Sequence, residues 1–229
     1  MTRRRHLSLP RALLCGAGAV ILLLALAQLV LPRIAESRIR SRLDPYGEVH
    51  SVHVSAWPAI ELLWGDADSA QVRAGELALS TARAATLLHE AKGISRISFT
   101  AAGIRLGKLR LTGATLDKHG NALTAAGIVS GGDLRAALPP GVTLRLLASR
   151  AGKVTVRVSG ALFGLGASLD AVGEASSGGI VVHPQGPLLG ALSLTLYSDP
   201  RVYVVGLSAV PVKTAAAPAY RVGLTALLR

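Results

Sequence analysis

The first part of the chain carries one long apolar run. Ala12 to Leu31 is a stretch of twenty residues in which Gln28 is the only strongly polar side chain. At about 1.5 Å per residue, a helix of this length would cross about 30 Å, the thickness of a hydrocarbon core. The segment also fits a cleaved export signal, because a basic leader precedes it and Ala25-Leu26-Ala27 has the small-x-small form of a signal peptidase site. The pattern predicts a transmembrane anchor or a signal helix within residues 1–31, and both readings stay open.

A second helical pattern follows directly. An apolar residue recurs every four positions, at Leu31, Ala35, Ile39 and Leu43. Arginines occupy the other faces, so the segment is amphipathic. Pro32 fits the first position of a new helix, and the turn Asp44-Pro45-Tyr46-Gly47 would end it. Such a helix could pack on its own domain, and its arginines could also contact anionic head groups beside a membrane.

Beyond residue 47, short apolar or alternating runs predominate and glycines separate them. Strands are expected at residues 48–56, 70–79, 94–99, 104–111, 121–129, 142–147, 153–158, 162–169, 179–183, 192–197, 201–210 and 219–227. Two later stretches have a helical pattern, residues 81–91 and 132–138. This spacing favours an α+β fold based on an antiparallel meander rather than on βαβ units.

The expected strand at residues 201–210 bears on function because both of its faces are apolar. The alternation places Val202 and Val204 on one face and Leu207 on the other. A sheet of this kind needs cover on both faces, and the chain has few helices to supply it. Either the sheet folds on itself as a packed sandwich or barrel, or part of it encloses an apolar ligand. Small side chains in the same strand favour a cavity.

The charge narrows the class of partner. The chain has a formal charge of +12, and the part after residue 32 alone still has a charge of +8. This balance suits an anionic partner, either nucleic acid or acidic lipid head groups. The arginines are dispersed, only eight residues are aromatic and no nucleic-acid-binding motif is present, which argues against nucleic acid. The single cysteine, Cys15, excludes an intrachain disulfide and a cysteine-based zinc site.

No pattern points to catalysis, a metal or a cofactor. His50 and His53 lie three positions apart on an expected strand, and therefore on opposite faces, so they cannot bind one metal ion together. The sequence contains no HExxH, GxSxG, P-loop or dinucleotide-binding motif. The sequence predicts a protein that is not an enzyme, with no catalytic residue, no metal site and no cofactor.

Several segments together resemble one protein family. AQLVLPRIAESRIRSRL, DPYGEV, SVHVSAWPAIELLWGDADSAQVRAGEL and GGDLRAALP look like the LmeA-like phospholipid-binding family of actinobacterial cell-envelope proteins. The resemblance runs from about Ala27 to the C-terminus and is strongest from Asp44 to Gly65. It implies an exported or membrane-tethered protein whose strongly curved antiparallel sheet wraps a long N-terminal helix and holds a phospholipid, as in lipid-transfer tubes. It further implies one lipid-binding domain at residues 32–229, behind the leader at residues 1–31.

The matching segment suggests where lipid meets the protein. The rim at which lipid enters, or at which the membrane is contacted, is expected at Trp57, Pro58, Ile60, Leu62, Leu63 and Trp64. Trp is favourable at a boundary between apolar and wet regions, although ordinary core positions for the two tryptophans stay open. Candidate cavity-wall residues are Val202, Val204 and Leu207. Candidate phosphate partners, through charge-assisted hydrogen bonds, are Arg38, Arg40 and Arg42.

The sequence therefore predicts a non-catalytic phospholipid-binding protein of the cell envelope, which holds or transfers acidic phospholipid in an apolar cavity beside the cytoplasmic membrane. Its expected partners are phospholipid and the membrane, and not nucleic acid. The domain is expected on the extracytoplasmic side, anchored by a single N-terminal helix or released after signal cleavage. The alternative is a structural or scaffolding envelope protein with a packed β core and no ligand. A second alternative is an envelope enzyme that uses the same fold.

Overall fold

A computed structural model of the chain describes the backbone at residues 9–138, 140–162, 165–186, 193–212 and 218–229. Side chains are described over the same ranges except at residues 9–25, 161–162 and 165–166. The helices are α1 (Leu9–Leu43), η1 (Asp44–Tyr46), η2 (Ala59–Leu63), α2 (Thr81–Glu90) and α3 (Gly131–Ala137). The strands are β1 (Gly47–Ser55), β2 (Ala67–Leu79), β3 (Ile94–Leu106), β4 (Leu109–His119), β5 (Ala122–Ser130), β6 (Thr143–Arg150), β7 (Lys153–Leu162), β8 (Leu165–Ser176), β9 (Gly179–Gln185), β10 (Leu194–Tyr197), β11 (Val202–Val212) and β12 (Ala219–Leu228).

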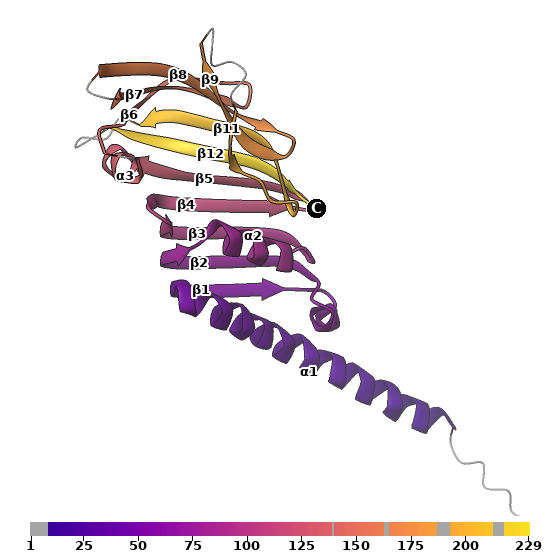
Figure 1. Cartoon of the computed structure of the whole chain (residues 1–229). Helices are drawn as coiled ribbons and strands as arrows, with labels where there is room; N and C mark the ends of the chain where they lie inside the picture. Colours follow the sequence, from indigo (N-terminus) through magenta and orange to yellow (C-terminus); the bar gives the residue numbers. More distant parts are fainter. Residues whose placement is uncertain (1–8, 139, 163–164, 187–192, 213–217) are drawn as a thin grey trace, which may run out of the picture.

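The strands form two sheets, and the α+β class is confirmed. A seven-stranded sheet has the order β1-β2-β3-β4-β5-β12-β11, and a five-stranded sheet has the order β10-β9-β8-β7-β6. Figure 1 shows the larger sheet rising strand by strand from α1, with the smaller sheet beyond β11. The strongly curved sheet that wraps the long helix is not confirmed by this arrangement, in which α1 packs beside β1 at one end of the larger sheet.

One strand pair departs from the antiparallel meander. β2 and β3 are parallel neighbours, whereas the other pairs within the described strands are antiparallel. Parallel neighbours need a crossover connection over one face of the sheet, and α2 is that connection. The prediction that the chain contains no βαβ unit is therefore wrong at this position. The helix itself was predicted, and the Ser80 side chain caps it by accepting a hydrogen bond from the backbone N–H of Arg83 at 3.2 Å.

The seven-stranded sheet has one apolar face. The strand register aligns a row of apolar side chains across all seven strands: Val52, Val72, Phe99, Leu116, Ala125, Leu224 and Leu207. A second row beside it consists of Val54, Ala70, Ile97, Lys118, Leu123, Ala226 and Val204. With strands spaced about 4.8 Å apart, six spacings give an apolar track of about 29 Å. We call this face the inner face.

The opposite, outer face of the same sheet is polar. Between the two apolar rows, the register aligns His53, Gln71, Ser98, Asp117, Thr124 and Thr225 on the outer face. An antiparallel sheet commonly keeps one face in water in this way. The expectation that this sheet needs cover on both faces is therefore not met, and only the inner face requires it.

A β-bulge explains why β11 looks apolar on both faces in sequence. The β11–β12 register shifts between Val204 and Gly206, so that Val204 lies opposite Ala226 and Leu207 lies opposite Leu224. Residues 224 and 226 are two apart on β12 and share one face. Val204 and Leu207 therefore both lie on the inner face although they are three positions apart, because the bulge inserts one extra residue.

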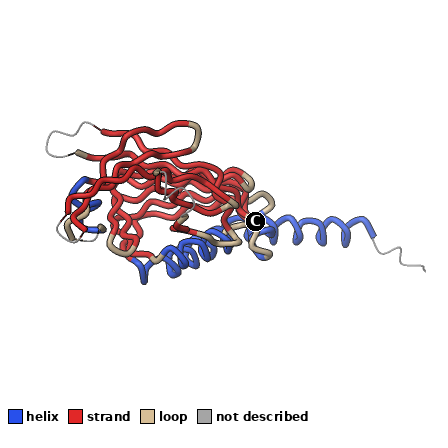
Figure 2. The backbone as a smooth tube through the Cα atoms, turned by 45° about the horizontal axis from the view of Figure 1, so that its top comes forward, coloured by secondary structure: helices blue, strands red, loops and turns tan. Residues whose placement is uncertain are grey.

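Helix α1 is one continuous element. Pro32 lies inside it rather than at the start of a new helix, so the sequence-based helix start at this residue is wrong. The C-terminal half of α1 packs through Ala35 and Ile39 against the apolar cluster of β1 and β2. Glu36 accepts a hydrogen bond at 3.1 Å from the backbone N–H of Val54 on the edge strand β1. Figure 2 shows the N-terminal part of α1 extending away from the strands.

The long apolar run falls mostly outside the described side chains. Residues 1–8 are not described, and side-chain description begins at Leu26, so the anchor or signal at residues 1–31 stays a prediction. Where side chains are described, no helix combines the length and the hydropathy that crossing a membrane requires.

The smaller sheet joins the larger one through two hairpin turns. The carbonyl oxygens of Gly178 and Gly152 accept hydrogen bonds from the backbone N–H groups of Val204 and Leu207, at 2.8 and 2.9 Å. Gly178 has a φ of +79°, and a Cβ atom there would lie 2.3 Å from the Tyr203 ring. Glycine is required at this turn both for its left-handed backbone and for this close approach.

Candidate functional site

A large cavity lies over the inner face of the seven-stranded sheet. Its volume is about 670 Å³, within the range of about 300 to 1,000 Å³ that is usual for ligand sites. The sheet contributes most of one apolar row, including Val72, Phe99 and Leu116. Helix α2 covers it with one face, which contributes Ala84, Ala85, Leu87 and Leu88, and Ala91 follows directly after the helix. The crossover connection between β2 and β3 therefore forms the second wall of the cavity.

The cavity lining is almost entirely apolar, with one ion pair. Among the described lining residues, Arg42 at the end of α1 and Glu90 at the end of α2 are the only charged ones. Nη1 of Arg42 donates to Oε2 of Glu90 at 2.7 Å, and the two side chains are 60% and 37% exposed. Their exposure places them at the boundary between the cavity and solvent, which we call the mouth. An ion pair this exposed contributes less than about 1 kcal/mol to stability.

Two of the three candidate wall residues line the cavity, and the third lies next to it. Val202 and Leu207 line the cavity, and Leu207 does so because of the bulge in β11. Val204 is buried at 1% exposure but is not among the lining residues. It packs on the same face in the neighbouring row.

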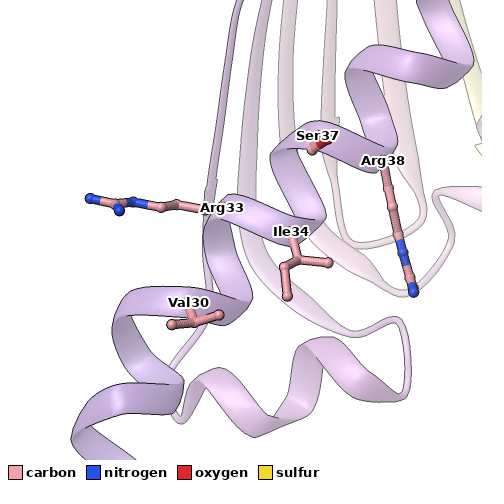
Figure 3. A pocket seen from close by; sticks show the side chains of 5 residues that line it. All are labelled: Val30, Arg33, Ile34, Ser37 and Arg38. Carbon is pink, nitrogen blue, oxygen red and sulfur yellow. The ribbon is translucent and has the colours of Figure 1, made fainter.

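The three candidate arginines do not converge on one site. Arg42 is at the mouth of the cavity, whereas Arg40 extends elsewhere and donates to the backbone carbonyl of His50 at 3.5 Å. Arg38 lines a separate hollow of about 360 Å³ on α1, together with Val30, Arg33, Ile34 and Ser37. Figure 3 shows Ile34 and Arg38 extending from one side of α1 and Arg33 from another. One exposed face of one helix cannot enclose a lipid, so the larger cavity is the candidate site.

The candidate rim is an exposed apolar surface beside α1. Trp57 is 77% and Trp64 71% exposed, and Ile60 and Leu63 are also exposed, so core positions for the tryptophans are excluded. Of the six rim residues, Leu62 packs inward against the cluster that also holds Ile39, while Pro58 is exposed. The rim segment is fixed by Asp68, which accepts a hydrogen bond at 2.8 Å from the backbone N–H of Trp57.

The rim continues onto α1. Helix η2 packs against α1, and the part of α1 before Ala35 exposes Leu26, Leu29, Val30 and Ile34. Exposed apolar side chains that gather in this way mark an interaction surface. Each side chain of this size contributes about 1.5 to 3 kcal/mol when it is fully buried. Transfer of this surface from water to an apolar environment is therefore favourable.

The comparison with protein families decides the identification. A family model described as LmeA-like phospholipid-binding matches residues 23–214. The chain belongs to this family. The match begins within α1 and includes β1 to β11, so the rim and all of the cavity lining except the part on β12 lie inside it. No curated protein and no solved structure matches the chain significantly.

Polar contacts on several sides hold α2 over the cavity of this LmeA-like domain. Glu90 pairs with Arg42 on α1, and Nη1 of Arg201 donates to the Thr86 hydroxyl at 2.9 Å. The hydrogen bonds and charge of Arg201 lower the pKa of Asp199 to about 2, so the Asp199 carboxylate stays ionised and keeps Arg201 in place. In the first turn of α2, the guanidinium of Arg83 lies 5.5 Å from the ring centroid of Tyr46.

A buried lysine fixes the end of the same crossover. Lys118 on β4 is 1% exposed, and its Nζ donates to the backbone carbonyl of Lys92 at 3.1 Å and to that of Ile94. The first carbonyl lies in the connection between α2 and β3 and the second belongs to the first residue of β3, so Lys118 anchors the end of this connection to the inner face. Burial lowers the pKa of Lys118 from its ordinary value of 10.5.

We expect replacement of Lys118 to destabilise the LmeA-like domain. Lys118→Met keeps the side-chain volume but leaves two carbonyls without donors, at a cost of about 1 to 3 kcal/mol. Lys118→Ala adds a cavity and is expected to cost more, about 2 to 5 kcal/mol. The measurement is the unfolding temperature of the full chain in detergent, where 1 kcal/mol corresponds to about 2 to 4 °C. A Lys118→Met chain as stable as the unchanged one would contradict the anchoring role.

The pH dependence of the unfolding temperature is a second test of the role of Lys118. Because the pKa of Lys118 is lower in the folded state, the unfolded state binds more protons between the folded pKa and 10.5. Stability contributed by this group therefore rises with pH across that window and is lowest below it. The unfolding temperature of the unchanged chain should rise with pH relative to that of Lys118→Met.

The sequence reasoning missed Lys118 and Glu90. Lys118 stands in the segment LDKHG before a turn, where a lysine is normally solvated. Glu90 is the last residue of an amphipathic helix and has no distinguishing spacing. The register of β4 is needed to see the partners of Lys118, and the path of α2 is needed to see that Glu90 pairs with Arg42. Within the part of the chain that the structure describes, no group of metal-ligating side chains is found.

Proposed function

We propose that this chain holds an acidic phospholipid in the cavity under α2. The acyl chains lie along the apolar rows of the inner face, and the phosphate is bound by Arg42 at the mouth. The observation that carries the proposal is the charge distribution of the lining, in which the only charged residues described lie together at the exposed end of an apolar cavity. This matches a ligand with a long apolar part and one charged end.

The second part of the proposal concerns the membrane. The rim with Trp57 and Trp64 contacts the bilayer, and α1 connects it to the mouth because Ile39 and Arg42 line the cavity. The basic charge of the chain suits an anionic membrane surface. The domain works on the extracytoplasmic side of the cytoplasmic membrane, anchored by the apolar run of residues 12–31 or released from it. The proposed role is to carry or present lipid, without catalysis.

Native mass spectrometry of the full chain tests this function. The chain is extracted in a mild detergent and its bound lipids are identified after release. We expect about one phospholipid per chain, enriched in anionic head groups and chemically unchanged after long incubation. A ligand-free chain would favour the scaffolding alternative, and lipid that is chemically altered would favour an enzyme.

A further inference from the structure

We propose that Glu90 is a gate for the lipid head group: it occupies the phosphate site on Arg42 while the cavity is empty, and an anionic head group displaces it. This inference rests on the proposed function, because it assumes that lipid enters the cavity at the mouth. It assigns a selectivity role to a residue of α2 that belongs to no recognised motif.

The contacts at the mouth support an exchange of partners. Oε2 of Glu90 lies 2.7 Å from Nη1 of Arg42, where a phosphate oxygen would bind. Both side chains are partly exposed and line the cavity. A phosphate accepts charge-assisted hydrogen bonds from a guanidinium in the same geometry as a carboxylate. The two anions therefore compete for one cation, and the Glu90 carboxylate opposes most strongly a head group with a net negative charge, because a zwitterionic head group balances its phosphate with an ammonium group.

The backbone around Glu90 is fixed, so the exchange is a side-chain movement. Lys118 anchors the connection that follows α2, and Ala85 packs against the inner face with Leu123 and Val202. Thr86 is bound by Arg201. Rotation of the Glu90 side chain away from Arg42 then frees the phosphate site without moving the helix.

The exposed side of α1 supplies a path to this gate. Val30, Ile34 and Arg38 are spaced four residues apart and line one hollow on α1, and Arg42 follows one turn further along the helix, where it lines the cavity. The first two are exposed apolar residues beside the rim, Arg38 follows in the hollow on α1, and Arg42 is at the mouth. A phosphate passed from Arg38 to Arg42 moves about 6 Å along the helix. The acyl chains meanwhile leave the rim for the cavity.

Competition between lipids tests the gate. The delipidated full chain in detergent is incubated with equal amounts of phosphatidylglycerol, phosphatidylethanolamine and phosphatidylcholine, and captured lipids are quantified by native mass spectrometry. Glu90→Gln is expected to raise the capture of phosphatidylglycerol relative to phosphatidylcholine by up to about fivefold, the range set by an exposed ion pair. Arg42→Gln is expected to remove the preference for the anionic lipid.

A matched control separates the gate from a general change in charge. Glu76 pairs with Arg110 at similar exposure and does not line the cavity. Glu76→Gln removes the same charge and should leave the ratio unchanged. Inorganic phosphate at the lipid concentration should also leave it unchanged, because it lacks acyl chains that hold it at the mouth. A shift with either would contradict the gate.

The outcomes distinguish this inference from the proposed function. If the unchanged chain captures none of the three lipids, the proposed function itself fails. If it captures lipid and Glu90→Gln behaves as the unchanged chain does, only the gate fails. If Glu90→Gln specifically reduces the capture of phosphatidylethanolamine, Glu90 binds the ammonium group of that lipid, and the displacement proposed here is wrong.

Discussion

Replacement of Ala125 by tryptophan is expected to lower the affinity of the full chain for lipid about tenfold. Ala125 lies on β5 in the apolar row between Leu116 and Leu224, and its methyl group lines the cavity. An indole at this position occupies space that the acyl chains need. Each excluded methylene group costs about 0.8 kcal/mol, so exclusion of two lowers affinity roughly tenfold. The measurement is the amount of lipid per chain by native mass spectrometry.

The neighbouring residue provides the matched control. Thr124 is on the same strand but on the polar outer face, so Thr124→Trp adds the same side chain outside the cavity and should keep the bound lipid. Ala84→Trp introduces the indole from α2, the opposite wall, and covers the case in which Ala125→Trp does not fold. If either cavity variant folds and still carries as much lipid as the unchanged chain, the lipid is bound elsewhere.

Bilayer contact by the rim is expected to quench the tryptophan fluorescence of the chain. Trp57 and Trp64 are the only two tryptophans in the sequence, and both are exposed in the rim. The intrinsic emission therefore reports on this surface alone. In vesicles with brominated acyl chains, we expect emission to fall by at least about half, because indole rings settle at the interface and meet the upper acyl chains. The reference is the same chain in unbrominated vesicles.

Single-tryptophan variants refine this experiment. Trp57→Phe and Trp64→Phe each leave one reporter and should both be quenched. A chain in which both tryptophans are replaced by Phe and Thr124 by Trp carries its reporter on the outer face of the sheet, and this reporter should keep its emission. Equal quenching of all three chains would indicate non-specific association, and unquenched rim tryptophans would contradict membrane contact.

Local patterns predicted most of the elements well. The alternation of apolar and polar residues identified β1, β5, β7 and β12 to within a few residues, and the helical pattern at residues 81–91 matches α2. Several boundaries were wrong, and one example shows why. Residues 94–99 and 104–111 were expected as separate strands, whereas β3 runs from Ile94 to Leu106 and β4 begins at Leu109. Gly103 looked like a break but lies within β3, and the turn is at Gly107, where φ is +61°.

The site was predicted in its chemistry more than in its geometry. The rim residues were proposed from the segment that resembles the family, and their aromatic and apolar character is a local feature of the sequence. The cavity-wall residues were chosen from their apolar alternation, and a one-residue bulge brought Leu207 onto the inner face, where it lines the cavity. Among the arginines, spacing alone could not identify Arg42 as the one at the mouth, because its partner is 48 positions away.

Local sequence patterns alone established that the chain has amphipathic strands, an aromatic segment that contains Pro58, excess positive charge and a resemblance to the LmeA-like family. These properties depend on residues a few positions apart, where side-chain alternation and helical periodicity are read directly. The tertiary structure alone decided that β2 and β3 are parallel. That pairing sends α2 across the inner face, and it creates both the cavity and the Arg42–Glu90 pair. Strand pairing depends on contacts between distant residues, and the same alternating pattern fits a parallel or an antiparallel neighbour equally well.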